Sequence, residues 1–450
     1  MWREWRGLMF PDPKNFSWLE KHTRKVIKHC RRVANFVPGF STHSVTVYVP
    51  GGDDKYPSFW IRDAVMQCRS GLIPAKEMET MIKVTLAFQN RPETQMLANR
   101  LQIPPWAIPD HIILPGLGSE EFRKRHPLGP VFYPGTYFSG KEQGNGFFGV
   151  RLPDDNLYEL VQLVYTFMTT TGLSSACQLL QSSVQNIPVW ERLHLGFQAM
   201  AVDEVTGLHW NTPTDWAASS FHDALRPMGA IALTSCLRFR AAAQMSDLSY
   251  CLGRKKEAEE YKDLAGKLAG AIQRTFQRRD GWLLAATQVN RQPDTWSTAM
   301  AGYYGILKGD DATAAAEALT RAYQEGSLTM NGYLRHTPVW ADDLPGKTVW
   351  EDSRLDKKKP YGWYQFGGYW PQPLGYVCWS IARIDRQAAT LLAQEFIDHT
   401  IRFADEGAPF EWVNPVVLRD KPGEGKWYGP SAALPLEGFR RLSQEEVKEN

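Results

Sequence analysis

Residues 56–67 have the sequence YPSFWIRDAVMQ, in which two aromatic residues and an Arg-Asp pair precede an apolar run typical of a helix. An aspartate at a helix start is favoured by the helix dipole and can cap free N–H groups, so one interpretation of Asp63 is a helix cap. The other is a sugar clamp, in which Trp60 offers a flat apolar face while Arg62 and Asp63 pair with hydroxyls. The same arrangement recurs farther along the chain, which favours the clamp.

Six predicted helices follow loops rich in aromatic and polar residues, and they begin near Arg62, Asp155, His222, Asp294, Trp370 and Ser431. Their interiors are small or apolar all round, as in STAMAGYYGIL and PLGYVCWSIA, whereas the intervening helices carry an apolar stripe. A helix that is apolar on every side is buried, and a striped helix lies at the surface. Six inner and six outer helices in alternation predict a mainly α fold, an (α/α)6 toroid (six-hairpin barrel) with a few short strands. All six loops rich in aromatic and polar residues, called the aromatic-polar loops below, would then line one cavity.

The chain is expected to form one catalytic domain, residues 1–450, with an N-terminal helical segment at 1–43. Residues 90–153 are irregular and rich in Pro and Gly, and a loop of this length is usually functional. We expect it to form a wall of the active site, because its aromatic residues are too apolar for a disordered linker. These aromatic residues are Trp106, Phe132, Tyr133, Tyr137, Phe138, Phe147 and Phe148.

The composition of the chain limits the kinds of partner and cofactor that are expected. Lys+Arg 51 against Asp+Glu 49 gives no charge bias, so neither a nucleic acid nor an anionic membrane is expected as a partner. The 17 Trp suit a carbohydrate cleft. The six Cys lack metal-ligand spacing, so we expect free thiols, no metal and no cofactor. The N-terminus, MWREWRGLMF, is too short and charged for a signal peptide, which favours a cytoplasmic protein or an exported one without its leader.

Glycoside hydrolysis needs two carboxyl groups flanking the scissile bond, and partial burial beside aromatics keeps one of them protonated. Asp215 qualifies, because Trp210 and Trp216 flank it in HWNTPTDWAASS; its alternative role is a helix cap. Glu411 qualifies in APFEWVNP, and its alternative role is a buried ion pair. Four further loop acids are expected to contact sugar hydroxyls or cap helices: Asp155, Asp223, Asp294 and Asp352.

Five segments, spread over most of residues 44–443, together resemble the six-hairpin glycosidases. This (α/α)6 group includes glucoamylase, the amylo-α-1,6-glucosidase part of glycogen debranching enzyme and processing α-glucosidases. FWIRDAVMQ resembles the W-x-R-D segment that holds the terminal sugar, and DDNLYELVQLVYTFMTTTG resembles the Asp-led helix that lines the pocket. GLHWNTPTDWAASS is similar to the loop with the general acid, although it matches no single family's acid motif. YQFGGYWPQPLGY resembles Y-Q-N-G-G-x-W with Phe366 in place of Asn, and EWVNP followed by YGPSAALPLEGF resembles the segment with the general base.

The resemblance implies an exo-acting glycoside hydrolase that cleaves a terminal, α-glucoside-like bond with inversion. Asp215 would be the general acid and Glu411 the general base. The expected substrate contacts are Trp60, Arg62, Asp63, Asp155, Trp210, Trp216, Gln365, Trp370 and Trp412.

Two other classes of function remain open. A carbohydrate epimerase or isomerase, or a polysaccharide lyase, can use the same toroid with His or Tyr as the base. Three histidines lie in or near the aromatic-polar loops, namely His209, His222 and His336. A non-catalytic carbohydrate-binding protein would bind sugar without turnover.

Overall fold

The computed structural model describes residues 12–37, 40–52, 55–133, 143–144, 149–218, 222, 225–341, 362–365, 367–416 and 422–449. Several residues singled out above lie outside this part of the chain, namely Tyr137, Phe138, Phe147, Phe148, Asp223, Asp352 and Phe366.

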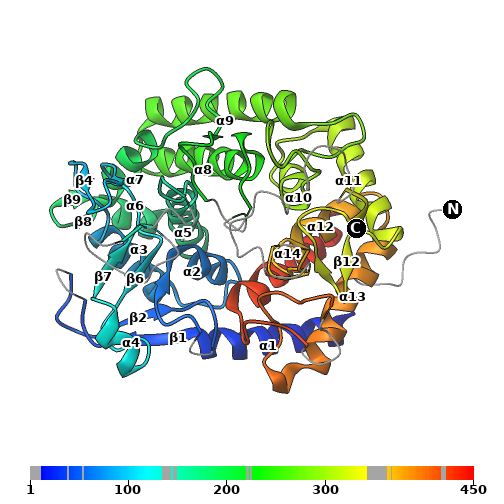
Figure 1. Ribbon diagram of the computed structural model, residues 1–450, viewed down its shortest axis with the longest axis horizontal. Helices are drawn as coiled ribbons and strands as arrows, with labels where there is room; N and C mark the ends of the chain where they lie inside the picture. The colour runs from blue at the N-terminus through cyan, green and yellow to red at the C-terminus, as the bar shows by residue number, and fades with distance from the viewer. Residues whose placement is uncertain are drawn as a thin grey trace.

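Six helices form a closed inner ring. They are α2 (Ile61–Cys68), α5 (Asn156–Thr171), α8 (Ala232–Cys251), α10 (Thr295–Tyr303), α12 (Leu374–Ala382) and α14 (Gly429–Glu449). Each helix contacts the next one in this order, and α14 contacts α2. Figure 1 shows these helices around the centre of the molecule. An (α/α)6 toroid requires this order of contacts.

The remaining long helices lie before or between the inner ones along the chain, α6 and α7 both between α5 and α8, and pack outside them (Figure 1). They are α1 (Pro13–Cys30), α3 (Ala75–Ala87), α6 (Leu173–Gln181), α7 (Val189–Gln198), α9 (Lys255–Phe276), α11 (Gly309–Gln324) and α13 (Arg386–Arg402). α1 contacts α14, α3 contacts α5, and α9 contacts α8. The short helices are α4 (Glu120–Arg125), η3 (Val339–Ala341) and η4 (Ala404–Glu406).

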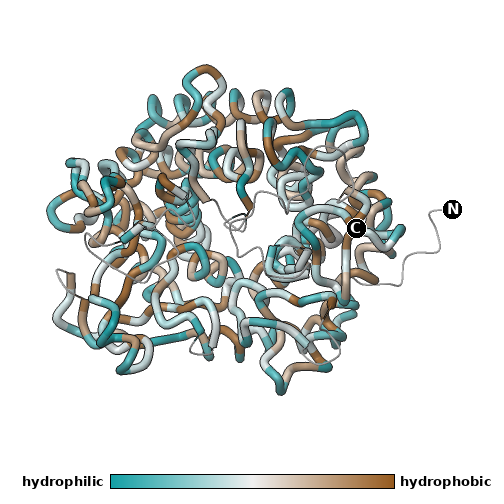
Figure 2. Tube along the Cα trace, in the orientation of Figure 1, coloured by the Kyte–Doolittle hydropathy of each residue, from teal (hydrophilic) through white to brown (hydrophobic). Residues whose placement is uncertain are grey.

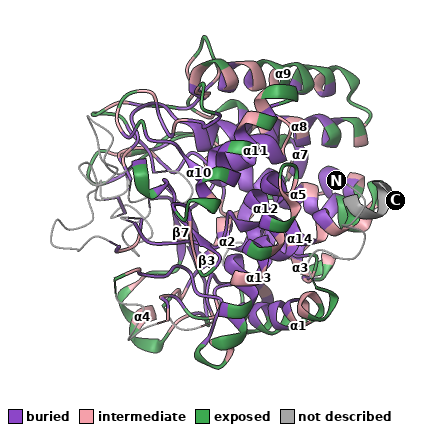
Figure 3. Cartoon of the chain, turned by 90° about the vertical axis from the view of Figure 1, so that its right-hand side faces the viewer, coloured by how far each residue is buried: buried purple, intermediate pink, exposed green. Residues whose placement is uncertain are grey.

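The sequence pattern explains which helices are inside. Every residue of α10 is buried, because its side chains are small, apolar or aromatic and none is charged. In α9 the buried residues form one stripe that includes Ala258, Tyr261, Leu268 and Ile272, while lysines and glutamates cover the other side. Figure 3 shows α10 and α12 as mainly buried and α9 with exposed stretches, and the tube of α9 in Figure 2 alternates between hydrophilic and hydrophobic.

The strands are short. β3 (Phe59–Trp60), β6 (His111–Ile113) and β7 (Gly129–Val131) form a three-stranded antiparallel sheet in the order β3-β6-β7, with Trp60 opposite His111. β1 (Arg31–Ala34) pairs with β2 (Val45–Tyr48). The other antiparallel pairs are β4 (Gln95–Met96) with β5 (Gln102–Ile103), β8 (Ser183–Val184) with β9 (Ile187–Pro188), β10 (Trp210–Asn211) with β11 (Gly229–Ala230), and β12 (Thr329–Met330) with β13 (Tyr333–Leu334).

The prediction of a mainly helical chain with few short strands is confirmed, but two helix boundaries and the expected irregularity of one segment were wrong. The first helix, expected over residues 15–36, ends at Cys30, because the next four residues form strand β1 and pair with β2. The helix expected from residue 222 begins at Ala232, after strand β11. Within residues 90–153 the structure contains β4 to β7 and α4, so this segment is only partly irregular. The single-domain organisation stays a prediction.

All six cysteines have free thiols. None of the helices in the described residues is long and apolar enough to cross a lipid bilayer.

Candidate active site

A bidentate ion pair joins the starts of two neighbouring inner helices. Arg62, in the first turn of α2, donates from Nε to Asp155 Oδ2 at 2.6 Å and from Nη2 to Asp155 Oδ1 at 3.1 Å. Asp155 directly precedes α5 and is fully buried. Burial raises the pKa of Asp155, and the Arg62 charge opposes this rise. The pair therefore fixes Arg62 at the end of the ring where α2 and α5 begin, which is called the polar end of the ring below.

A second contact joins α2 to α14. The Tyr428 hydroxyl, one residue before α14, donates to Asp63 Oδ1 at 2.5 Å. Burial, helped by the charges of Glu411 and Asp110, raises the pKa of Asp63 to about 7, although the Tyr428 hydrogen bond and the Arg62 charge oppose this rise. Asp63 is thus a buried carboxyl group that titrates near neutral pH. Among the described residues, the Asp63 side chain makes no hydrogen bond that caps α2.

Glu411 belongs to the same cluster. Its Oε2 accepts hydrogen bonds from Lys55 Nζ at 2.9 Å and from the Tyr56 hydroxyl at 2.5 Å, and its side chain is 3% exposed. The Tyr56 ring also contacts Tyr428, with a centroid distance of 5.9 Å. Tyrosines therefore connect Glu411 to Asp63, which lies far away in the sequence. The ion pair expected as an alternative for Glu411 is present, with the half-exposed Lys55 as its partner.

The backbone beneath Glu411 requires a glycine. The Glu411 amide donates to the carbonyls of Glu424 and Gly425, and Gly425 has a φ of +66°. A Cβ at Gly425 would lie 2.6 Å from the Glu411 Cβ, which is closer than real Cβ contacts allow. This close approach holds Glu411 against the 422–428 loop.

One aromatic side of the cluster is built on the short sheet. Trp60 stacks on His111 with a centroid distance of 4.5 Å, as their opposite register positions on β3 and β6 allow. The His111 Nδ1 lies 2.9 Å from Asp110 Oδ2. Sequence analysis missed Asp110 and His111, although they belong to the segment that was expected to form a wall. It also missed Tyr56, within the quoted segment, as a partner of Glu411.

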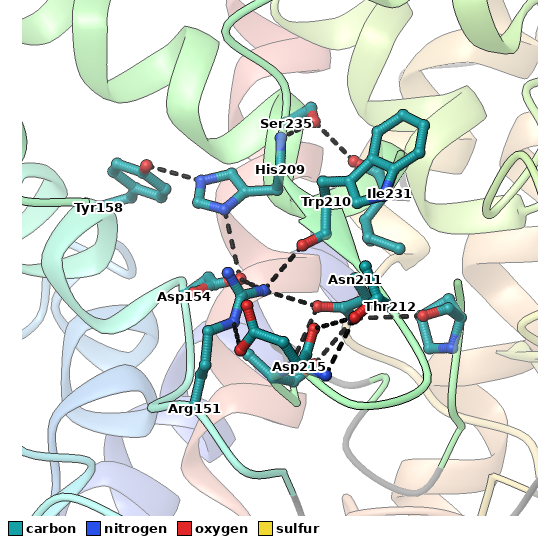
Figure 4. Close-up of polar contacts among 12 residues, drawn as sticks. Arg151, Asp154, Tyr158, His209, Trp210, Asn211, Thr212, Asp215, Ile231 and Ser235 are labelled. Carbon is teal, nitrogen blue, oxygen red and sulfur yellow. Dashed lines mark hydrogen bonds and ion pairs between the residues drawn. The ribbon is translucent and has the colours of Figure 1, made fainter. Parts of the chain in front are cut away.

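Asp215 lies in a different polar group (Figure 4). Arg151 Nε lies 3.2 Å from Asp215 Oδ1, and Arg151 Nη2 lies 3.6 Å from Asp154 Oδ2. Asp154 in turn lies 3.3 Å from His209 Nδ1, and the His209 Nε2 is 2.7 Å from the Tyr158 hydroxyl. Arg151 thereby connects the exposed loop of Asp215 with the buried start of α5.

The expectation that two tryptophans bury Asp215 is wrong. Its side chain is 61% exposed, Trp210 is 37% exposed, and only Trp216 is buried. Backbone hydrogen bonds between Thr212 and Asp215 close a turn in the loop between β10 and β11. The Asp215 side chain lies at the surface of this turn, while the next residue packs inward. The helix-cap alternative is also excluded, because α8 begins at residue 232.

A cavity of about 500 Å3 lies beside Asp215. Its lining includes Trp106, Tyr133, Arg151, Asp154 and Asp215. Neither Asp63 nor Glu411 is among its lining residues. Trp106 and Tyr133 come from the segment expected to form an active-site wall.

Most of the predicted sugar-binding tryptophans are packed in the core. Trp216 and Trp412 are 2% exposed and Trp370 is 0% exposed, so the expectation that their faces are open to a sugar is corrected. Trp370 and Trp412 stack on each other with a centroid distance of 6.3 Å. Gln365 is also fully buried. Trp60 and Trp210 are the predicted tryptophans that keep exposed surface in the described structure.

The three histidines considered as alternative bases are buried. His222 Nε2 lies 3.1 Å from Asp294 Oδ1, and Asp294 caps α10 by accepting a hydrogen bond from the Ser297 amide at 2.6 Å. Burial lowers the pKa of His336 to about 3 and also lowers the pKa of His209. An imidazole with a pKa of about 3 is a weak base at neutral pH, so this geometry does not favour the lyase or epimerase alternative.

No protein-family model matches this sequence. No curated protein sequence matches it either. Solved structures do match its fold. A rhamnosidase from Klebsiella oxytoca with rhamnose bound gives a TM-score of 0.55 at 10% identity, over 96% of this chain and 65% of that chain. The GH78 family rhamnosidase of Bacillus sp. GL1 gives a TM-score of 0.55 at 10% identity, over 96% of this chain and 35% of that chain. A wild-type glycosidase gives a TM-score of 0.51 at 13% identity, over 95% of this chain and 97% of that chain.

This chain thus has the fold of two rhamnosidases and a glycosidase, and it spans less than two thirds of the length of either rhamnosidase. At such low identities the likeness establishes the fold alone. The narrower resemblance to glucoamylase and debranching enzyme stays a prediction.

Proposed function

We propose that this protein is an inverting, exo-acting glycoside hydrolase with an (α/α)6 toroid. The observation that carries the proposal is the cluster at the starts of α2 and α14. There Asp63 and Glu411 are connected through Tyr56 and Tyr428, next to Trp60. The cluster offers one carboxyl group as a base, and a second carboxyl group, hydroxyl groups and a partly exposed tryptophan that can hold a sugar.

Glu411 is the proposed general base. The Lys55 ammonium and the Tyr56 hydroxyl both contact Oε2 and hold the carboxylate in one orientation. We assign Oε1 as the oxygen that takes the proton from the attacking water. A general base must be an ionised carboxylate, and the Lys55 ammonium beside Glu411 carries the opposite charge.

Asp215 is the proposed general acid, and the adjoining cavity would hold the leaving group. Its carboxyl group is exposed to solvent in the ligand-free protein. A sugar in the cavity would remove water from Asp215, and desolvation favours the protonated form of a carboxyl group. Arg151 opposes this effect from 3.2 Å. An inverting mechanism requires the Asp215 and Glu411 carboxyl groups to lie roughly 6.5–9.5 Å apart in the substrate complex.

Arg62, Asp63 and Asp155 are the proposed contacts of the terminal sugar. Asp63 is 4% exposed and Glu411 is 2% exposed, so a terminal sugar would meet these carboxyl groups below the protein surface. The motif resemblance favours an α-glucoside-like substrate. The fold likeness to a rhamnosidase with rhamnose bound makes α-rhamnosides the second class to test.

The test is a panel of aryl and disaccharide α-glucosides and α-rhamnosides with product analysis. We expect the wild type to release a free sugar, and Glu411→Gln to lower kcat by roughly 10²–10⁴-fold while sugar binding persists. Glu424→Gln, in the neighbouring loop, is the matched control and should keep its activity. An unsaturated or epimerised product would favour the lyase or epimerase alternative, and binding without turnover by the wild type would contradict hydrolysis.

A further inference from the structure

Two cysteines that are far apart in the sequence meet at the outer side of the ring. Cys177 lies on α6, and Cys251 is the last residue of α8, 74 residues later. Their Sγ atoms are 2.6 Å apart, and the two helices contact each other. The Cys251 Sγ also lies 3.3 Å from the Leu173 carbonyl oxygen, which fixes this thiol against the start of α6.

The pair differs from the other cysteines of the chain. Both residues are partly exposed, whereas Cys30, Cys68, Cys236 and Cys378 are buried. An oxidant from solvent therefore reaches Cys177 and Cys251 and not the other four. A disulfide has a sulfur–sulfur bond of about 2.05 Å, so only a small movement separates this pair from bonding.

We propose that Cys177 and Cys251 form an intramolecular disulfide bond that joins α6 to the end of α8. With a small-molecule disulfide such as oxidised glutathione as the oxidant, a thiolate of the pair attacks one glutathione sulfur and releases the first reduced glutathione. The second thiolate then attacks the mixed disulfide and releases another. The protein loses two protons and two electrons, and the oxidant gains them.

The position of this bond predicts what it changes. It closes a long loop, and in the chain-entropy description a long closed loop restricts the unfolded chain strongly. The start of α8, beside His209, is about 30 Å from Cys251, because the helix has 20 residues and rises about 1.5 Å per residue. The disulfide should therefore raise stability and leave the polar end of the ring unchanged.

The experiment compares the purified protein after treatment with oxidised glutathione and with dithiothreitol. Alkylation after unfolding should label four cysteines in the oxidised protein and six in the reduced one, and a non-reducing peptide map should contain the peptides of Cys177 and Cys251 linked. The Tm of the oxidised form should be higher by roughly 2–4 °C.

Cys177→Ser and Cys251→Ser are the matched variants, and neither should show the linked peptides or the oxidation-dependent rise in Tm. Six labelled cysteines in the oxidised wild type would overturn the proposal, and so would a stable glutathione adduct at either position. The peptide map of the wild type decides the question even if a variant fails to fold. None of these readouts depends on glycosidase activity, so the result is independent of the proposed function.

Discussion

Replacing Asp63 with Asn tests the electrostatics of the cluster directly. Burial raises the pKa of Asp63 from its usual 3.8 to about 7 in the folded protein. Between these two values the unfolded chain has released a proton that the folded protein still binds. Stability therefore falls as the pH rises from about 4 to about 7, because the folded protein must then hold an ionised, buried carboxylate. Asp63→Asn removes this proton and keeps a carbonyl oxygen as acceptor for Tyr428.

The magnitude follows from the two pKa values. A rise from 3.8 to about 7 corresponds to about 4 kcal/mol of stability across the whole window. Between pH 5 and pH 8 the wild type should lose about 2–3 kcal/mol relative to Asp63→Asn. The stability of the variant should therefore exceed that of the wild type by more at pH 8 than at pH 5.

Urea unfolding of both proteins at several pH values between 5 and 8 measures this difference. Tyr428→Phe is the matched control, because it removes the hydrogen bond that lowers the Asp63 pKa. In that variant the loss of stability should extend to higher pH. A difference between wild type and Asp63→Asn that stays constant from pH 5 to pH 8 would refute the reasoning.

Three further outcomes are expected. Arg62→Lys replaces a bidentate pair with a single contact to Asp155, so kcat/KM should fall by about 2 kcal/mol, roughly 30-fold, in steady-state assays. Trp106→Ala should raise KM for a disaccharide but not for a glycosyl fluoride, which has no leaving-group sugar; equal effects on both would remove the cavity from the account. Gly425→Ala should lower both Tm and kcat, because its Cβ would displace Glu411; an unchanged kcat would show that Glu411 tolerates the shift.

The sequence pattern was sufficient to predict which segments form buried helices and which form outer ones, although not where each helix begins. The uncharged segment STAMAGYYGIL is apolar on every side, and the corresponding helix α10 is fully buried. The striped segment after residue 255 became the outer helix α9. Such patterns depend on residues only a few positions apart, and each helix carries them by itself.

The contacts that build the site depend on residues far apart, and no local pattern predicts them. Tyr428 and Asp63 are separated by 365 residues, and only ring closure brings them together. The aromatic content of a loop also does not show which way a ring faces. Trp370 and Trp412 pack on each other inside the protein. Asp215 lies at the surface because it ends the turn that begins at Thr212. The two tryptophans that flank Asp215 in the sequence do not indicate this turn.

Proton NMR of the anomeric signals during turnover is the most direct test of the central claim. The substrate is the member of the glycoside panel that the wild type cleaves fastest, and the first product formed is recorded before mutarotation. The account predicts a sugar of inverted anomeric configuration from the wild type, and loss of this signal in Glu411→Gln. A first product of retained configuration, or undiminished turnover by Glu411→Gln, would contradict it.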